Sequence, residues 1–172
     1  MSCLGDFLES AVVMAPLRTF ASLCSASLLA TVVGLWSSAM AATAANELAQ
    51  QTTIYRDDFG VPHVIGATDE STIFGFGYAQ AEDFFWQVED SYLLALGRYC
   101  EAHGPRGLNS DLLNRAFEIV PRSQRDFPAL DAATRDLCRA FVEGINFYLA
   151  NHPEVRPRLL AKFEPWHVLA LH

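Results

Sequence analysis

Acidic, amide and aromatic side chains are mixed in the stretch GFGYAQAEDFFWQVED, residues 75–90. Its acids and amides include Gln80, Glu82, Asp83, Glu89 and Asp90. No Lys or Arg lies between Arg56 and Arg98, so nothing within the stretch neutralises these charges at helical spacing. Side chains of these types can perform acid–base catalysis, bind a metal ion, or bond other segments of the chain.

The spacing of the acids does not suit a pair of catalytic carboxylates. On a helix, Glu82 and Glu89 lie two turns apart, about 10 Å along the axis, whereas the paired carboxylates of glycosidases are roughly 5 to 9.5 Å apart. Glu82 and Asp83 are adjacent in sequence but about 100° apart around the helix. Because a buried carboxylate without a partner costs several kcal/mol, we expect these acids to bond arginines or backbone amides of other segments. The candidate arginines are Arg56, Arg98 and Arg115.

Metal-ligating and nucleophilic residues form no recognisable signature. Cys100 and His103 are spaced i, i+3 and Cys138 could join them from a later helix, but the sequence has no C-x-x-C pair. His63 follows Pro62 in a strand-like segment, where a lone His is usually structural. The sequence also lacks a G-x-S-x-G motif, a phosphate-binding loop and an HExxH motif. These residues alone predict a scaffold with no catalytic residue and no metal site.

The elements that position these residues begin with a predicted hairpin. Two short strands are expected within residues 52–67, the first beginning at Ile54 and the second spanning residues 61–67, around a turn at residues 57–60 in which Gly60 can take a positive φ. Pro62 cannot donate a ladder hydrogen bond, so it should begin the second strand or lie at an edge.

A long helix is predicted from Asp69, its N-cap, to Tyr99, since apolar residues recur every three or four positions. It is apolar on most of its circumference, as is typical of a helix buried within a larger structure. Gly75 and Gly77 weaken a helix, which indicates that another backbone approaches closely there. The later helices are a short one capped by Ser110 or Asp111, a long one from Asp131 to about Asn151, and one that begins after Pro165.

Residues 1–41 have the pattern of an export signal. Arg18 precedes an apolar run over residues 23–36, and Ala39-Met40-Ala41 supplies a small-residue cleavage site. The run is shorter than the roughly twenty consecutive apolar residues of a membrane anchor. We therefore expect a periplasmic or extracellular protein that is not stably inserted in a membrane.

The start of this signal has an alternative at Met14, because Asp6 and Glu9 suit a signal poorly. Cleavage would leave Cys100 and Cys138, either as one disulfide or as two thiols. Residues 42–51 are then expected to be a linker. Net charge is −8, with no basic cluster beyond a loose group near residues 156–162, so no nucleic-acid partner is expected.

Four ordered blocks resemble one known family. The segment IYRDDFGVPHVIGATDESTIFGFGYAQAEDFFWQVE, followed by LGRYCEAHG, is similar to the start of the α subunit in the penicillin acylase family, which includes penicillin, cephalosporin and acyl-homoserine-lactone acylases. FVEGINFYL and FEPWHVLAL resemble later landmarks of that subunit, in the same order. The residues that match the motifs, which we interpret as architectural, are Arg56, Asp57, Gly60, Pro62, His63, Tyr78, Gln80, Glu82 and Asp83.

The resemblance implies an α+β protein that belongs to an αββα N-terminal-nucleophile hydrolase, made by autocatalytic cleavage of one precursor. It implies hydrolysis of a linear amide, which releases an acyl group from a β-lactam nucleus, a homoserine lactone or a related amine. The nucleophile, a Ser or another small residue, begins a separate β subunit and uses its own α-amine as base.

Residues 52–172 then correspond to a truncated portion of the α subunit, with no catalytic residue of their own and with a β subunit as partner. No cofactor is expected, and a structural calcium ion in the complete enzyme would have its ligands outside this chain. The alternative is a secreted, non-catalytic helical binding module, or the product of a decayed gene, that retains the scaffold.

If residues 1–41 are an export signal, the mature protein should begin within about three residues of Ala41. N-terminal sequencing of exported material checks this prediction. A mature protein that begins at Met1 or Met14 would contradict it.

Overall fold

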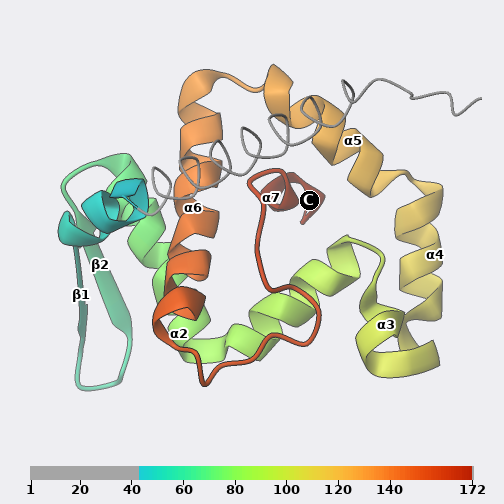
Figure 1. Ribbon diagram of the computed structural model, residues 1–172, viewed down its shortest axis with the longest axis horizontal. Helices are drawn as coiled ribbons and strands as arrows, with labels where there is room; N and C mark the ends of the chain where they lie inside the picture. Colours follow the sequence, from blue (N-terminus) through green and yellow to red (C-terminus); the bar gives the residue numbers. More distant parts are fainter. Residues whose placement is uncertain (1–42, 172) are drawn as a thin grey trace, which may run out of the picture. The chain divides into compact units, whose positions relative to one another are not determined.

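The computed structural model describes residues 43–171, so the predicted export signal at residues 1–41 lies outside the described residues. A two-stranded antiparallel sheet is followed by a series of helices (Figure 1). The predicted α+β class, with two short N-terminal strands and then mainly helices, is confirmed. Among the described residues, no helix combines the length and the apolar character needed to cross a membrane.

The segment predicted as a linker is helical over residues 43–50. Ala45 is buried in a small apolar cluster with Phe74 and Ala140, and Leu48 packs against the same cluster. This part of the segment is therefore packed on the helices rather than free. Its few apolar residues make too short a pattern to be assigned a period from sequence.

The hairpin has the predicted form. Strand β1 (Thr52–Arg56) pairs with β2 (Pro62–Gly66), and the register places Arg56 opposite Pro62 at the end of the ladder. Gly60 has φ = 80°, and its N–H donates to the carbonyl oxygen of Asp57 at 2.9 Å. Pro62 begins its strand, where its missing N–H leaves the ladder intact.

Helix α2 spans Asp69–Ala95, and its N-cap is Thr68 rather than the predicted Asp69. The Thr68 hydroxyl accepts from the Ser71 N–H at 3.2 Å, and the Ser71 hydroxyl accepts from the Thr68 N–H at 2.8 Å. This is a reciprocal capping box, in which Ser replaces the usual Glu or Gln. Asp69 lies one position later, in the first turn, where its charge is favourable.

The predicted extension of α2 to Tyr99 is wrong. Gly97 has φ = 64°, and the N–H groups of Gly97 and Arg98 donate to the carbonyls of Leu94 and Leu93 at 3.0 and 2.8 Å. These two bonds form a Schellman motif, which ends a helix with a left-handed glycine. Within α2, non-helical angles at Phe84 (φ −148°, ψ 51°) produce a kink.

The chain continues through short helices to a second long helix, α6, and ends near α7 (Figure 1). As predicted, α6 is capped by Asp131, which accepts from the Thr134 N–H at 2.9 Å, and ends at Asn151. The elements after α2 are α3 (Tyr99–His103), η1 (Gly104–Gly107), α4 (Leu108–Ala116), α5 (Ile119–Asp126), η2 (Phe127–Ala129), α6 (Ala132–Asn151) and α7 (His167–Ala170).

The predicted cap of the short helix α4, Ser110 or Asp111, is wrong. The helix begins at Leu108, and buried Asp111 instead accepts the N–H groups of Tyr99 and Cys100 at 3.0 and 2.8 Å. A capping residue was recognised from its type, but it serves the neighbouring helix α3.

Helices α2 and α6 cross with their backbones in close contact. A Cβ atom added to Gly77 would clash with the carbonyl oxygen of Phe141, and one added to Gly144 would clash with the backbone of Phe74 and Tyr78. The predicted close approach of another backbone is therefore confirmed at Gly77 and wrong at Gly75, which faces side chains of the hairpin instead. The main core lies around this pair of helices and includes Phe85, Tyr92, Leu93, Val142, Ile145 and Phe163.

Gly144→Ala should lower the free energy of unfolding by roughly 3 kcal/mol, because a methyl group has no space between the two backbones. Helix propensity alone predicts the opposite sign, a gain of about 1 kcal/mol. Ala150→Gly, at an exposed position of the same helix, is the matched control and should cost about 1 kcal/mol. Urea denaturation measures both changes, and a Gly144→Ala variant as stable as the parent would refute the proposed crossing.

Candidate functional site

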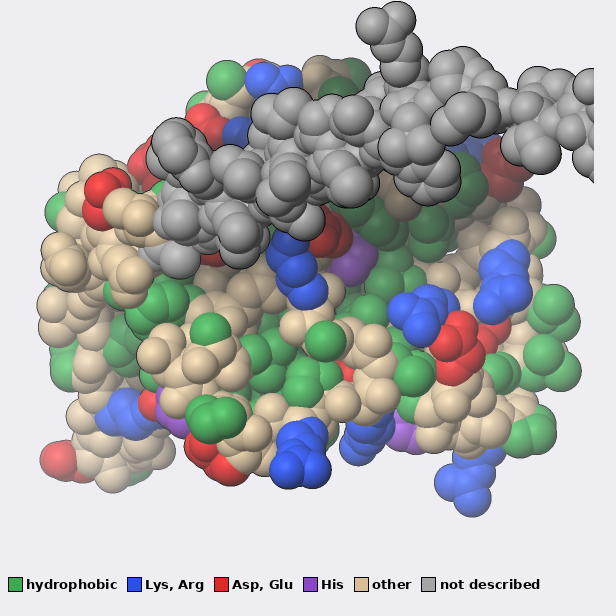
Figure 2. All heavy atoms as spheres, viewed as in Figure 1, with side chains coloured by type: hydrophobic (Ala, Val, Ile, Leu, Met, Phe, Trp, Pro, Cys, Tyr) green, Lys and Arg blue, Asp and Glu red, His purple; other side chains and the backbone are tan. Residues whose placement is uncertain are grey.

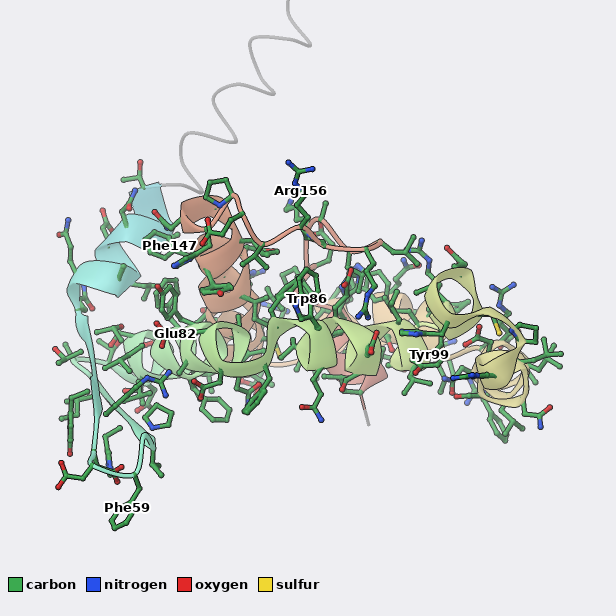
Figure 3. All side chains as sticks on the ribbon, turned by 90° about the horizontal axis from the view of Figure 1, so that it is seen from below. Phe59, Glu82, Trp86, Tyr99, Phe147 and Arg156 are labelled. Atoms are coloured by element: carbon green, nitrogen blue, oxygen red, sulfur yellow. The ribbon has the colours of Figure 1, made fainter. Side chains whose placement is uncertain are left out.

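Most of the residues that match the family motifs gather where the hairpin meets α2, near Glu82 in Figure 3. Nη2 of Arg56 lies 2.6 Å from Oε2 of Glu82 and 2.6 Å from Oδ1 of Asp83. Its Nη1 donates to the carbonyl oxygen of Gly60 at 2.9 Å. Hydrogen bonds to the two carboxylates raise the pKa of the Arg56 guanidinium above its ordinary value. One guanidinium thus joins the hairpin turn to two consecutive acids of α2.

Asp57 shapes the hairpin turn. Its Oδ1 accepts from the N–H groups of Phe59 and Val61 at 2.9 and 3.0 Å, and its Oδ2 lies 3.1 Å from Nε2 of His63. The hydrogen bond from His63, followed by that from Val61, lowers the pKa of Asp57. The His63 ring stacks on Tyr55, with centroids 4.7 Å apart. The hydrogen-bond partners of the Asp57 carboxylate therefore all lie within the hairpin.

The remaining motif residues, Tyr78 and Gln80, lie on different sides of α2. The Tyr78 ring packs edge-on against Tyr148 at 5.5 Å, and burial raises its pKa. Gln80 borders a groove of about 360 Å³ together with Pro62 of the hairpin and the half-exposed Phe76. Asp83 of the Arg56 cluster lines the same groove, so the structure brings Gln80, Pro62 and Asp83 together, whereas Tyr78 is not among the residues that line it.

Glu89 is completely buried on α2. Its carboxylate accepts three backbone N–H groups: Oε2 from Arg158 at 3.1 Å, and Oε1 from Leu159 and Leu160 at 2.9 and 3.0 Å. Hydrogen bonds of this kind satisfy a buried charge without a counter-ion. Glu89 therefore fixes a segment about 70 positions further along the chain.

Asp90, the next residue, binds the same segment from its surface side. Its Oδ1 lies 2.7 Å from Nε2 of His103 and 2.6 Å from Nη1 of Arg158. The Arg158 guanidinium also lies over the Trp86 ring, 5.5 Å from its centroid. With these contacts, each acid of residues 75–90 has a partner in another segment.

Sequence reasoning did not find Asn146. Its Nδ2 donates to the carbonyl oxygen of Phe163 at 2.9 Å, and its Oδ1 accepts the Phe163 N–H at 2.8 Å. An Asn within the apolar block FVEGINFYL was the available signal, because an amide partly removed from water requires hydrogen-bond partners.

Within residues 43–171 these groups do not form a catalytic pair. The hydrogen-bond partners of the Ser and Thr side chains at positions 52, 68, 71, 72, 91 and 134 do not include a His, and the described residues contain no cluster of His, Cys, Asp or Glu fit for a metal ion. Cys100 and Cys138 are free thiols, and burial raises the pKa of both, which disfavours the reactive thiolate. The arrangement positions segments of the chain relative to one another.

Comparison with known proteins places this geometry in context. A family model described as penicillin amidase matches residues 51–172. The chain is 32% identical over 130 residues to penicillin acylase 2 proenzyme of a Pseudomonas species. This alignment covers 72% of this chain and 17% of that protein. It is 29% identical over 114 residues to acyl-homoserine lactone acylase QuiP of Pseudomonas fluorescens, 66% of this chain and 14% of that protein. The chain thus spans less than a fifth of either relative.

A solved structure has a similar fold. Thermostable penicillin G acylase from Alcaligenes faecalis matches with a TM-score of 0.60 and 25% identity, over 70% of this chain and 69% of that chain. The match in sequence and the match in structure point to the same family.

Glu89→Gln should lower the free energy of unfolding by about 2 to 3 kcal/mol, because an amide group removes the charge and turns an N–H₂ toward buried N–H donors. The matched control is Asp136→Asn, which breaks the exposed pair with Arg139 and should cost less than about 0.5 kcal/mol. Chemical denaturation measures both. Equal effects of the two substitutions would show that the Glu89 contacts do not hold the segment.

Proposed function

Because the chain belongs to the penicillin amidase family, we propose that it is the N-terminal part of an exported acylase that hydrolyses a linear amide. In this reaction the C–N bond breaks, water supplies the hydroxyl of the released acid, and the amine leaves with a proton. The match of the family model over residues 51–172 carries the proposal. The relatives include enzymes named penicillin acylase and acyl-homoserine lactone acylase, which supports an N-acylated β-lactam nucleus, homoserine lactone or related amine as substrate.

The nucleophile of the proposed enzyme belongs to another polypeptide, a β subunit cut from the same precursor. The absence of a paired nucleophile among the described residues supports this division of roles, as does the chain's share of its relatives' length. An N-terminal Ser or similar residue would attack the acyl carbon, with its own α-amine accepting the proton. The Arg56 and Asp57 contacts would then serve as architecture at a distance from the reaction.

Apolar surface supports the proposed β subunit as a partner. Apolar side chains reach the surface over several elements of the face shown in Figure 2. Across the described chain, the ring of Phe59 at the hairpin turn is 93% exposed, Phe84 at the kink of α2 is 66% exposed, and Phe117 after α4 is 60% exposed. Under this proposal a second chain covers these exposed rings.

Localisation and cofactors complete the proposal. Export rests on the signal pattern of residues 1–41, with cleavage near Ala41. The proposed hydrolysis needs no cofactor, and a structural calcium ion, where the complete enzyme has one, would be bound by residues outside this chain.

Under this proposal the 172-residue chain alone should not hydrolyse phenylacetyl or long-chain acyl amides above the rate of a heat-denatured control. The product of the complete gene should hydrolyse at least one of them and should contain a second polypeptide with a nucleophilic N-terminal residue. Replacing that residue by Ala should abolish turnover.

Two results would contradict the proposal. Turnover by the 172-residue chain alone would place the catalytic residues within it. A complete, correctly folded gene product that is never cleaved and hydrolyses no acyl amide would instead favour a non-catalytic binding module.

A further inference from the structure

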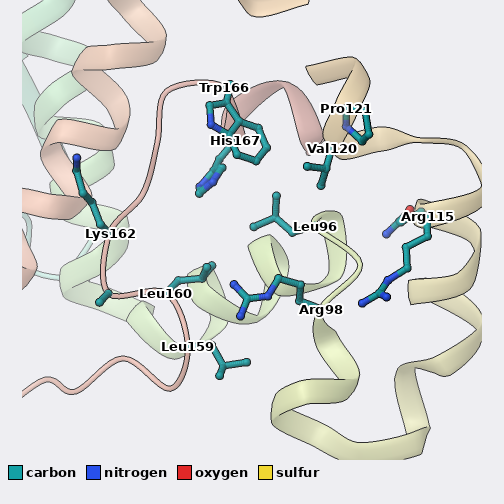
Figure 4. A pocket seen from close by; sticks show the side chains of 12 residues that line it. Leu96, Arg98, Arg115, Val120, Pro121, Leu159, Leu160, Lys162, Trp166 and His167 are labelled. Atoms are coloured by element: carbon teal, nitrogen blue, oxygen red, sulfur yellow. The ribbon is translucent and has the colours of Figure 1, made fainter. Parts of the chain in front are cut away.

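A cavity of about 640 Å³ lies between the end of α2, helices α4 and α5, and the segment before α7 (Figure 4). It is separate from the Arg56 cluster, and its volume is in the range of small-molecule sites. Three of its lining residues are basic, namely Arg98, Arg115 and Lys162, and no Asp or Glu is among the described residues that line it. This is unusual in a chain with 20 acidic and 12 basic residues.

The two arginines keep unused donors. Arg115 donates through Nε and Nη2 to the carbonyl oxygen of Gly97, at 3.2 and 3.0 Å. Arg98 uses Nε and Nη2 for Glu101, the closest distance being 2.7 Å. In each case the hydrogen bonds shown for the guanidinium do not use Nη1. Because every nitrogen of a guanidinium is a donor, Nη1 can donate to a ligand. These contacts fix both side chains and leave N–H groups for another molecule.

His167 adds a neutral donor. Its Nδ1 accepts the backbone N–H of Glu164 at 3.2 Å, so the ring proton is on Nε2. Burial lowers the pKa of His167 to about 4, and the ring is therefore uncharged at neutral pH. In Figure 4 the His167 ring points into the cavity, toward the same space as Arg98 and Leu96.

The other side chains that line the cavity are mainly apolar, and hydrogen bonds to Glu89 fix part of their backbone. Leu96, Leu159, Leu160 and Trp166 line the cavity, and Leu159 and Leu160 are the residues whose N–H groups bind buried Glu89. An apolar body would find contact with these side chains. The site combines apolar walls with donors, and the carboxylates beside its cations are those of Glu101, which pairs with Arg98, and Glu164, which lies 3.2 Å from Nζ of Lys162.

We propose that this cavity binds an organic carboxylate with an apolar body, held by Arg98 and His167 and supported by Arg115 and Lys162. The proposal goes beyond amide hydrolysis and does not depend on it. The ion pair of Arg98 with Glu101 and the hydrogen bonds of Arg115 to the Gly97 carbonyl oxygen fix the two arginines, and neither set of bonds uses Nη1.

The test is a titration of the 172-residue chain with 5-phenylpentanoate, observed by NMR of the tryptophan indole N–H groups. Trp166 lines the cavity, so its indole N–H resonance should shift with a Kd of about 1 mM. The resonance of Trp86, which lies on α2 and does not line the cavity, should not shift. The neutral amide of the same acid should bind about tenfold more weakly, because it lacks the charge. High salt should weaken binding of the acid more than that of the amide.

Variants then locate the charge. Arg98→Gln and Lys162→Gln should each weaken binding, with Arg98→Gln the larger effect at about tenfold. Arg125→Gln removes an exposed pair with Asp126 away from the cavity and should leave binding unchanged. Near-UV circular dichroism verifies the fold of each variant. If Arg98→Gln does not fold, the Lys162→Gln variant tests the proposal instead, because its side chain is 73% exposed.

Three outcomes would overturn the proposal. The first is no Trp166 shift at probe concentrations up to about 10 mM. The second is equal affinity for the acid and its amide, which would show an apolar cavity without anion recognition. The third is unchanged binding in folded variants of both basic residues. Since the assay measures binding and not turnover, its failure would leave the proposed acylase function unaffected.

Discussion

The close crossing of α2 and α6 is the constraint on which the other contacts depend. Gly77 and Gly144 let the backbones meet, and this fixes the positions of Glu89 on one helix and Asn146 on the other. Each of these side chains then binds the backbone of the same extended segment, Glu89 near residue 159 and Asn146 at Phe163. Buried Phe163 is thereby held in the core between the two helices, against Phe85 and Tyr92.

The acidic residues of α2 connect this helix to the segments around it. Glu89 is fully buried and needs a partner from another segment, whereas Glu82, Asp83 and Asp90 are partly exposed and use their charge to bind segments that pack beside the helix. Arg56 reaches Glu82 and Asp83 from the hairpin, and Asp90 binds the side chains of His103 and Arg158. The acids hold the hairpin, helix α3 and the late segment around one helix, which explains a sequence that has the residues of a catalytic site but not their spacing.

Sequence reasoning succeeded where the signal is local. The turn at Gly60, the strand start at Pro62 and the Asp131 cap each depend on residues within a few positions. It failed where a common residue took an unusual partner. Ser71 completes a capping box normally made by Glu, and Asp111 caps a helix that precedes it in the chain. The contact between Asn146 and Phe163 was not predictable in this way, because no local pattern specifies a partner 17 positions away.

The bonds of Glu89 also impose an order on biosynthesis. Its last partner, Leu160, lies 71 residues later, and at about 5 to 20 residues per second a ribosome needs roughly 4 to 14 s to add that length. During this interval the carboxylate has no native partner and stays in water, so α2 cannot reach its final burial. The nascent chain must therefore keep its longest apolar helix partly exposed until the late segment has been made. If the chain is exported, as proposed above, this delay would keep it unfolded enough to pass through a narrow translocation channel.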